Sequence, residues 1–162
     1  MEIPSRQTRA ANVQFREGLV ESVEGRFDLV LGIFFLHHIP DEALGRMLES
    51  IHNRLAPGGV FYGLDPSRHR LSGAVGRVLF PSLMRKYQTP DERELDAALV
   101  SEFFAAEGMQ CETGYYDFIS SPLAGLLPGW RAGYHVARTA DDLLLRIPGL
   151  RRLGSNLEIV GR

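Results

Sequence analysis

Apolar and polar residues follow one another along this chain in blocks that predict strands and helices. The run 27–35 (FDLVLGIFF) is almost all apolar, which is typical of a parallel strand buried on both faces beneath helices. Asp41 is the predicted N-cap of the next helix, whose apolar residues recur at helical spacing at Leu44, Met47, Leu48, Ile51 and Leu55. The turn Pro57–Gly59 ends that helix, and Val60–Leu64 is a second strand. Together these segments predict one right-handed βαβ crossover.

The same alternation of strands and helices continues through the rest of the chain. The further predicted elements are strands at Asn12–Arg16, Met109–Phe118 and Asn156–Val160, and helices at Leu71–Leu83 and Asp91–Glu107. Residues 119–155 form a long apolar excursion with a helix broken at Pro148, and we expect an insertion or lid there. Such alternation predicts an α/β fold with an open sheet.

Length and composition narrow the classes of protein that remain. The 162 residues predict a single domain spanning 1–162. A formal net charge of −2 argues against nucleic-acid binding, which needs a basic face. The single cysteine, Cys111, allows no internal disulfide, and no run of 18 apolar residues predicts a transmembrane helix. These features predict a cytoplasmic location.

Candidate binding residues follow from where the predicted strands end. Ligands of open α/β sheets bind outside the carboxyl ends of the strands, which here are Gly18–Val20, Gly32–His38 and Asp65–Ser67. Gly32 interrupts a bulky strand, so either a ligand or a crossing helix approaches its backbone closely. Arg68, with His69 and Arg70 after it, either meets an anionic substrate group or lies in a solvated loop.

The pair His37-His38 is the candidate catalytic feature of the chain. Histidine transfers protons near neutral pH, so either residue is a candidate general base. The alternative is that one histidine packs and caps the following helix while the other lines the pocket rim. No Asp, Glu or Cys follows at ligand spacing, so we predict no metal site.

Several short motifs together resemble the class I S-adenosylmethionine-dependent methyltransferases. The resemblance covers roughly residues 9 to 108, and the final strand 156–162 more loosely. The matching segments are Val13–Gly18, Phe27–Val30, Gly32–Phe34, Leu36–His38, Leu55–Gly59 and the Gly turn 107–109. It implies a partial Rossmann-like sheet, mostly parallel with an antiparallel last strand, helices on both faces and a helical insertion before that last strand.

The resemblance also implies S-adenosylmethionine as cofactor and roles for particular residues. Leu19 and Val20, following Gly18, would lie beside the adenine, and Gly32, Ile33 and Phe34 would line the wall near the sulfonium. Two positions depart from the family pattern. Leu19 stands where an acidic residue often holds the adenine amino group, and Ile33 stands where a small or polar residue is common. Both changes make the predicted site more apolar.

The family's first two strands and the Gly-rich cofactor loop between them have no counterpart before Val13. We therefore expect either a fragment of a longer enzyme or a chain that pairs with another chain, or with itself, at the strand edge left open. An apolar edge strand promotes such association.

Two functions follow from these patterns. The first is a methyltransferase acting on a small, hydrophobic molecule, with the segments Leu71–Tyr87 and Pro122–Trp130 as a lid over the acceptor. The second is a non-catalytic methyltransferase-like module that binds a protein partner through its open sheet edge. A nucleic-acid methyltransferase is disfavoured, because Leu36–Ile39 replaces the Asn/Asp-Pro-Pro-Tyr/Phe type of motif expected there.

Overall fold

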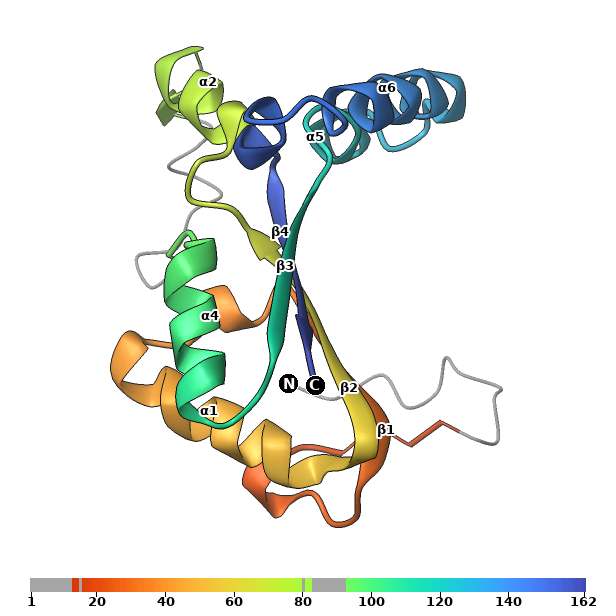
Figure 1. Ribbon diagram of the computed structural model, residues 1–162. Helices are drawn as coiled ribbons and strands as arrows, with labels where there is room; N and C mark the ends of the chain where they lie inside the picture. Colours follow the sequence, from red (N-terminus) through yellow and green to blue (C-terminus); the bar gives the residue numbers. More distant parts are fainter. Residues whose placement is uncertain (1–12, 15, 80, 83–92) are drawn as a thin grey trace.

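The computed structural model describes residues 13–14, 16–79, 81–82 and 93–162, and its centre is a four-stranded sheet of order β1-β2-β4-β3 (Figure 1). Strands β1 and β2 are parallel, whereas β4 runs antiparallel to both of its neighbours. The strands are β1 (Phe27–Ile33), β2 (Leu55–Pro66), β3 (Cys111–Tyr116) and β4 (Asn156–Gly161). The predicted mostly parallel sheet with an antiparallel last strand is confirmed, and β1 lies at its edge.

Two helices cover one face of this sheet. Helices α1 (Asp41–Arg54) and α4 (Ala97–Ala106) lie on the same side in Figure 1. They bury a single core together with the inward side chains of β2 and β4. Its largest fully buried members are Phe61, Phe104, Leu36, Leu44, Leu48, Ile51, Leu95, Leu157 and Ile159. Burial of this apolar area is the main stabilising contribution to the fold.

The opposite face of the sheet is open over β1. Side chains alternate between the two faces of a strand, and Phe27, Leu29, Leu31 and Ile33 are all between 41% and 60% exposed. We predicted that β1 would be buried on both faces and that helices would cover both faces of the sheet. In the described residues, helices cover only the face that carries α1 and α4. The reason is that no helix of the described part packs against the outward side chains of β1.

The remaining helices lie beyond the carboxyl ends of β2 and β3, at the top of Figure 1. They are α2 (Leu71–Leu79), α5 (Ser120–Leu126), α6 (Arg131–Leu144) and the 3₁₀ helix η3 (Leu150–Leu153). The last three stand between β3 and β4, so the predicted helical insertion before the final strand is confirmed. Asp141, fully buried in α6, accepts the backbone N–H groups of Ile119 and Ser120 at 2.9 Å each and so joins α6 to the start of α5.

Local chemistry explains where the helices begin. Helix α1 has Pro40 as its N-cap, without a side-chain cap, so Asp41 is the first helical residue and not the predicted cap. Its carboxylate forms an ion pair with Arg93 instead. Helix α4 is capped by Asp96, whose carboxylate accepts the N–H of Ala98 at 2.9 Å.

The predicted helix start at Asp91 lies outside the described residues, so Asp96 marks the start of α4 within them. Of the predicted strand Asn12–Arg16, the described residues 13, 14 and 16 are not in a strand.

The Pro57–Gly59 segment belongs to β2 and not to a turn before it. The pairing of β1 with β2 shifts register at this point, between Phe27 and Leu29. A side chain at Gly59 would stand 2.8 Å from the Phe27 carbonyl oxygen, so glycine is required for the close approach of the two strands. Over the described ranges, no helix is long and apolar enough to cross a membrane.

A pair of leucine variants tests which face of the sheet is covered. We expect Leu48→Ala, at a fully buried site on α1, to lower the free energy of unfolding by about 2–5 kcal/mol. Leu31→Ala, on the open face, should change it by only about 0.5 kcal/mol. Urea denaturation of both variants measures the difference. A loss at Leu31 equal to that at Leu48 would show that the outward face is covered in solution.

Candidate functional site

Buried polar side chains gather at one edge of the sheet. The edge is formed by the carboxyl ends of β1, β2 and β3 and by the amino end of β4. The buried polar residues there are His37, Asp65, Ser67, Asp117, Ser120, Asp141, Ser155 and Asn156. Because ligands of open α/β sheets bind at this edge, the layer marks the candidate site.

A histidine–aspartate pair stands at the ends of β1 and β2. His37, in the 3₁₀ helix η2 (Leu36–His38), places its ring Nδ1 2.7 Å from Asp65 Oδ1, and its backbone N–H donates to the same oxygen at 3.2 Å. The backbone oxygen of His37 accepts the N–H of Arg93 at 3.1 Å. Asp65 Oδ2 is buried and has no hydrogen-bond partner among the described residues. Asp65 thus orients the His37 ring.

The two predicted catalytic histidines have different surroundings. His37 is buried, whereas His38 is exposed, and their ring centroids lie 3.9 Å apart. Neither side chain caps helix α1, which has no side-chain cap. His37 therefore packs without the predicted capping role, and the place of His38 at a pocket rim stays a prediction.

The predicted cofactor wall at the end of β1 has two parts. Gly32 is buried, and a side chain there would stand 3.0 Å from the Phe61 ring, so its small size is explained by packing within the protein. Ile33 and Phe34 are each 48% exposed. Phe34 has a φ of 49° and donates its N–H to the Leu64 oxygen at 2.7 Å. Ile33 and Phe34 thus form an apolar projection at the candidate edge.

Gly18, Leu19 and Val20 lie elsewhere. Val20 opens the 3₁₀ helix η1 (Val20–Ser22), where the Glu21 oxygen accepts a hydrogen bond from Arg54, the last residue of α1, at 2.9 Å. Because β2 begins directly after Arg54, this contact lies at the amino end of the sheet. The structure does not bring these three residues together with Ile33 and Phe34, and their predicted place beside an adenine stays a prediction.

Sequence reasoning missed a second buried acid, Asp117. It follows β3 with a φ of 52°, and Asn156 donates to its Oδ1 at 3.2 Å. Burial raises the pKa of the Asp117 carboxyl, and the charge of Asp141 adds to this effect against the hydrogen bonds from Ser121 and Asn156. An available signal was its position: like Asp65, Asp117 stands directly at the carboxyl end of a predicted strand.

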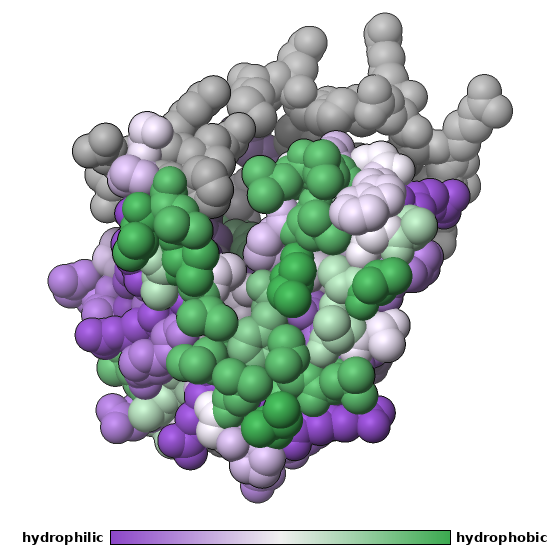
Figure 2. Space-filling model, turned by 90° about the horizontal axis from the view of Figure 1, so that it is seen from above, coloured by the Kyte–Doolittle hydropathy of each residue, from purple (hydrophilic) through white to green (hydrophobic). Residues whose placement is uncertain are grey.

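An apolar cavity of about 270 Å³ lies beside this edge, between α2 and the insertion. Figure 2 shows hydrophobic side chains gathered on this end of the molecule, over α2 and over α5 and α6. The cavity is lined by Leu71, Ser72, Val75, Phe118, Ile119, Leu144 and Leu150. Among the residues that the structure describes, no three His, Cys, Asp or Glu side chains are grouped to hold a metal ion.

Comparisons with known proteins find this architecture among solved structures. No protein-family model matches the sequence, and no curated protein matches it. The complex between the Haloferax volcanii Trm112 methyltransferase activator and the putative methyltransferase matches with a TM-score of 0.58, 18% identity, and coverage of 95% of this chain and 63% of that chain.

Two further matches agree with the first. A SAM-dependent methyltransferase from Archaeoglobus fulgidus has a TM-score of 0.53 at 11% identity, with 88% of this chain and 62% of that chain covered. The DhpI-SAM-HEP complex has a TM-score of 0.52 at 18% identity, with 93% of this chain and 58% of that chain covered. This chain has the class I S-adenosylmethionine-dependent methyltransferase fold. It spans 58 to 63% of the length of these three matched chains.

The buried carboxyl of Asp117 makes the stability of this methyltransferase fold depend on pH. Because the pKa of Asp117 is raised on folding, the folded chain binds the proton at a higher pH than the unfolded chain does. The residue therefore destabilises the fold at neutral pH, and stability recovers as the pH falls through the raised pKa.

We expect Asp117→Asn to be more stable than the parent at pH 7, with the difference shrinking toward pH 4, where the unfolded carboxyl also protonates. Asparagine tolerates positive φ, which keeps the backbone unstrained. Urea denaturation at both pH values, with the exposed Asp28→Asn as control, measures this. An Asp117→Asn variant no more stable than the parent at pH 7 would contradict it.

Proposed function

We propose that this chain is an S-adenosylmethionine-dependent methyltransferase that acts on a small, hydrophobic molecule. The observation that carries the proposal is the methyltransferase fold with an apolar cavity at its ligand-binding edge. The DhpI complex is described as holding SAM and the Archaeoglobus protein as SAM-dependent. A cavity lined almost wholly by apolar side chains favours a hydrophobic acceptor.

The residues at the end of β1 fit part of such a cofactor. When bound, S-adenosylmethionine supplies a methyl group already activated by its positively charged sulfur. Ile33 and Phe34 offer an exposed apolar wall against which the cofactor would lie. A role for Gly18, Leu19 and Val20 beside the adenine requires the segment before β1 to lie at the carboxyl edge instead of against α1.

His37 is the proposed general base. Asp65 accepts a hydrogen bond from Nδ1–H, so the neutral ring carries its free lone pair on Nε2. That nitrogen would take the proton of the acceptor's nucleophile, and the Asp65 carboxylate would stabilise the imidazolium formed. His38, exposed beside it, is the second candidate. The buried setting of His37 would exclude water and hold the acceptor's nucleophile in line with the methyl group to be transferred.

The acceptor would lie under the two predicted lid segments. Most of the described part of the first is α2, which contributes Leu71 and Val75 to the apolar cavity. The second, Pro122–Trp130, includes most of α5. Both present exposed apolar side chains, including Val78, Leu126 and Trp130. Such side chains would cover a hydrophobic acceptor and separate the reacting atoms from solvent.

Calorimetric titration of the chain with S-adenosylmethionine and S-adenosylhomocysteine tests cofactor binding. We expect binding by the parent and at least 5-fold weaker binding by Phe34→Ala, because it removes an exposed part of the wall. Val136→Ala, an exposed apolar truncation on α6 outside both lid segments, is the control and should bind as the parent does. Absence of binding by a folded chain would contradict the enzyme hypothesis.

His37→Gln tests the proton transfer. We expect at least a 100-fold loss of S-adenosylhomocysteine release with a panel of hydrophobic alcohols and phenols, with cofactor affinity unchanged. His52→Gln, at an exposed histidine on α1, should keep full activity. Equal turnover of His37→Gln and the parent at all pH values would remove His37 from the mechanism.

A second candidate function rests on the free edge of β1. Within the described sheet β1 pairs only with β2, and its outer edge and four exposed apolar side chains suit a protein partner that adds a strand. If the chain binds no cofactor and sediments as an assembly that Leu31→Lys dissociates, this non-catalytic binding role replaces the enzymatic one. A monomer that binds S-adenosylmethionine would exclude it.

A further inference from the structure

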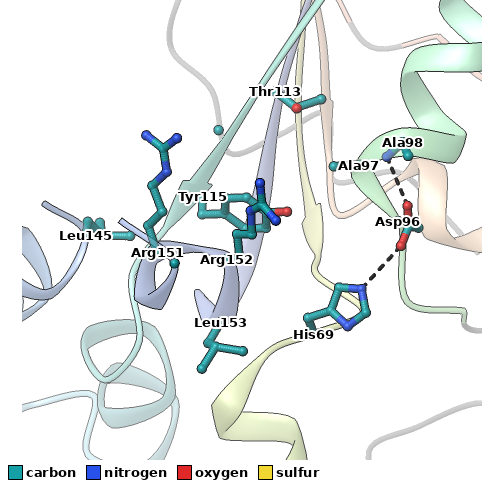
Figure 3. A pocket seen from close by; sticks show the side chains of 12 residues that line it. His69, Asp96, Ala97, Ala98, Thr113, Tyr115, Leu145, Arg151, Arg152 and Leu153 are labelled. Atoms are coloured by element: carbon teal, nitrogen blue, oxygen red, sulfur yellow. Dashed lines mark hydrogen bonds and ion pairs between the residues drawn. The ribbon is translucent and has the colours of Figure 1, made fainter. Parts of the chain in front are cut away.

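A second, larger cavity lies on the other side of η3. It measures about 820 Å³, opens to solvent, and is lined chiefly by β3, η3 and the start of α4 (Figure 3). Leu150, the first residue of η3, lines the apolar cavity, whereas Arg151 and Arg152, which follow it, line this one. The short helix therefore separates an apolar cavity from a cationic one.

Two consecutive arginines, Arg151 and Arg152, stand on the wall of this cavity. Arg151 and Arg152 are exposed, and neither forms an ion pair or a side-chain hydrogen bond with any residue in the described ranges. Figure 3 shows both side chains extending from η3, with Tyr115 of β3 on the wall of the same cavity. Two unpaired positive charges on one wall favour the approach of an anion to this cavity.

The acidic residue of the cavity wall is already engaged. Asp96 accepts the N–H of Ala98 at 2.9 Å as the cap of α4, and its other oxygen lies 3.3 Å from His69 Nε2. Its carboxylate is therefore directed to the helix and to His69, as the dashed lines in Figure 3 show. The charge facing the cavity from η3 is left positive.

We propose that this cavity binds a small molecule bearing a phosphate or carboxylate group, with Arg151 and Arg152 holding the anion. Guanidinium groups donate paired hydrogen bonds to such groups and keep their charge at every physiological pH. Thr113 and Tyr115, whose side chains carry hydroxyl donors, line the same cavity. The volume is that of a site for a small organic molecule, larger than an inorganic ion needs.

This site goes beyond the proposed function, because it requires neither the cofactor nor the methyl acceptor. Its residues belong to β3, η3 and the start of α4, whereas the proposed cofactor wall belongs to β1. A failure of methyl transfer would therefore leave this inference untouched, and a failure of anion binding would leave the proposed enzyme untouched.

Calorimetric titration with three probes at constant ionic strength tests the proposal. The probes are inorganic phosphate, benzoate and phenyl phosphate, which separate the anion from the organic part. We expect phenyl phosphate to bind most tightly, with a Kd below 1 mM. Arg151→Gln/Arg152→Gln should raise that Kd at least 10-fold.

The matched control is Arg46→Gln/Arg131→Gln, which removes the same charge from exposed positions on α1 and α6. It should bind phenyl phosphate as the parent does. Urea denaturation confirms that both double variants are folded, which the exposure of all four arginines favours. Equal weakening by the two double variants, or no binding of any probe by the parent, would overturn the proposal.

Discussion

The buried carboxylate of Asp65 sets the constraint on which the candidate edge depends. A fully buried carboxylate is costly unless hydrogen bonds compensate it. His37 supplies both a backbone and a ring donor, and so holds the chain in the tight turn of η2 directly after β1. Arg93 in turn binds the His37 and Ile39 oxygens and pairs with Asp41, which ties the segment before α4 to the start of α1. One buried charge thereby aligns the ends of β1 and β2 and the start of α1.

The parts of the fold that follow from local patterns were predictable. The apolar residues of α1 recur on one face, and β3 and β4 fall within one or two residues of the predicted strands, because local spacing determines each of them. The exposure of β1 was not predictable from its sequence. An apolar run has the same residue pattern whether one or both faces of the strand are covered, because the burial of the second face depends on which distant segments pack against it.

The candidate site divides in the same way. Strand ends marked Asp65, Ile33 and Phe34 correctly as residues of one edge, since parallel strands place their carboxyl ends together. The Asp65–His37 contact and the Asn156–Asp117 contact join residues 28 and 39 positions apart, and no spacing rule reports such pairs. Gly32 shows the reverse case. Its lack of a side chain suggested close approach by either a ligand or a crossing helix, yet the Phe61 ring of β2 accounts for it.

The position of β4 has a consequence for how the chain assembles. Strand β3 hydrogen-bonds only to β4 within the described sheet, and β4 also pairs with β2. Residues 67–155 must therefore be synthesised before the strand that completes the sheet exists. Until then β2 has a free edge and Phe61 lacks its neighbours from β4. Contacts between residues so distant in sequence slow folding, so a nascent chain would stay open to aggregation or chaperone binding until its last strand inserts.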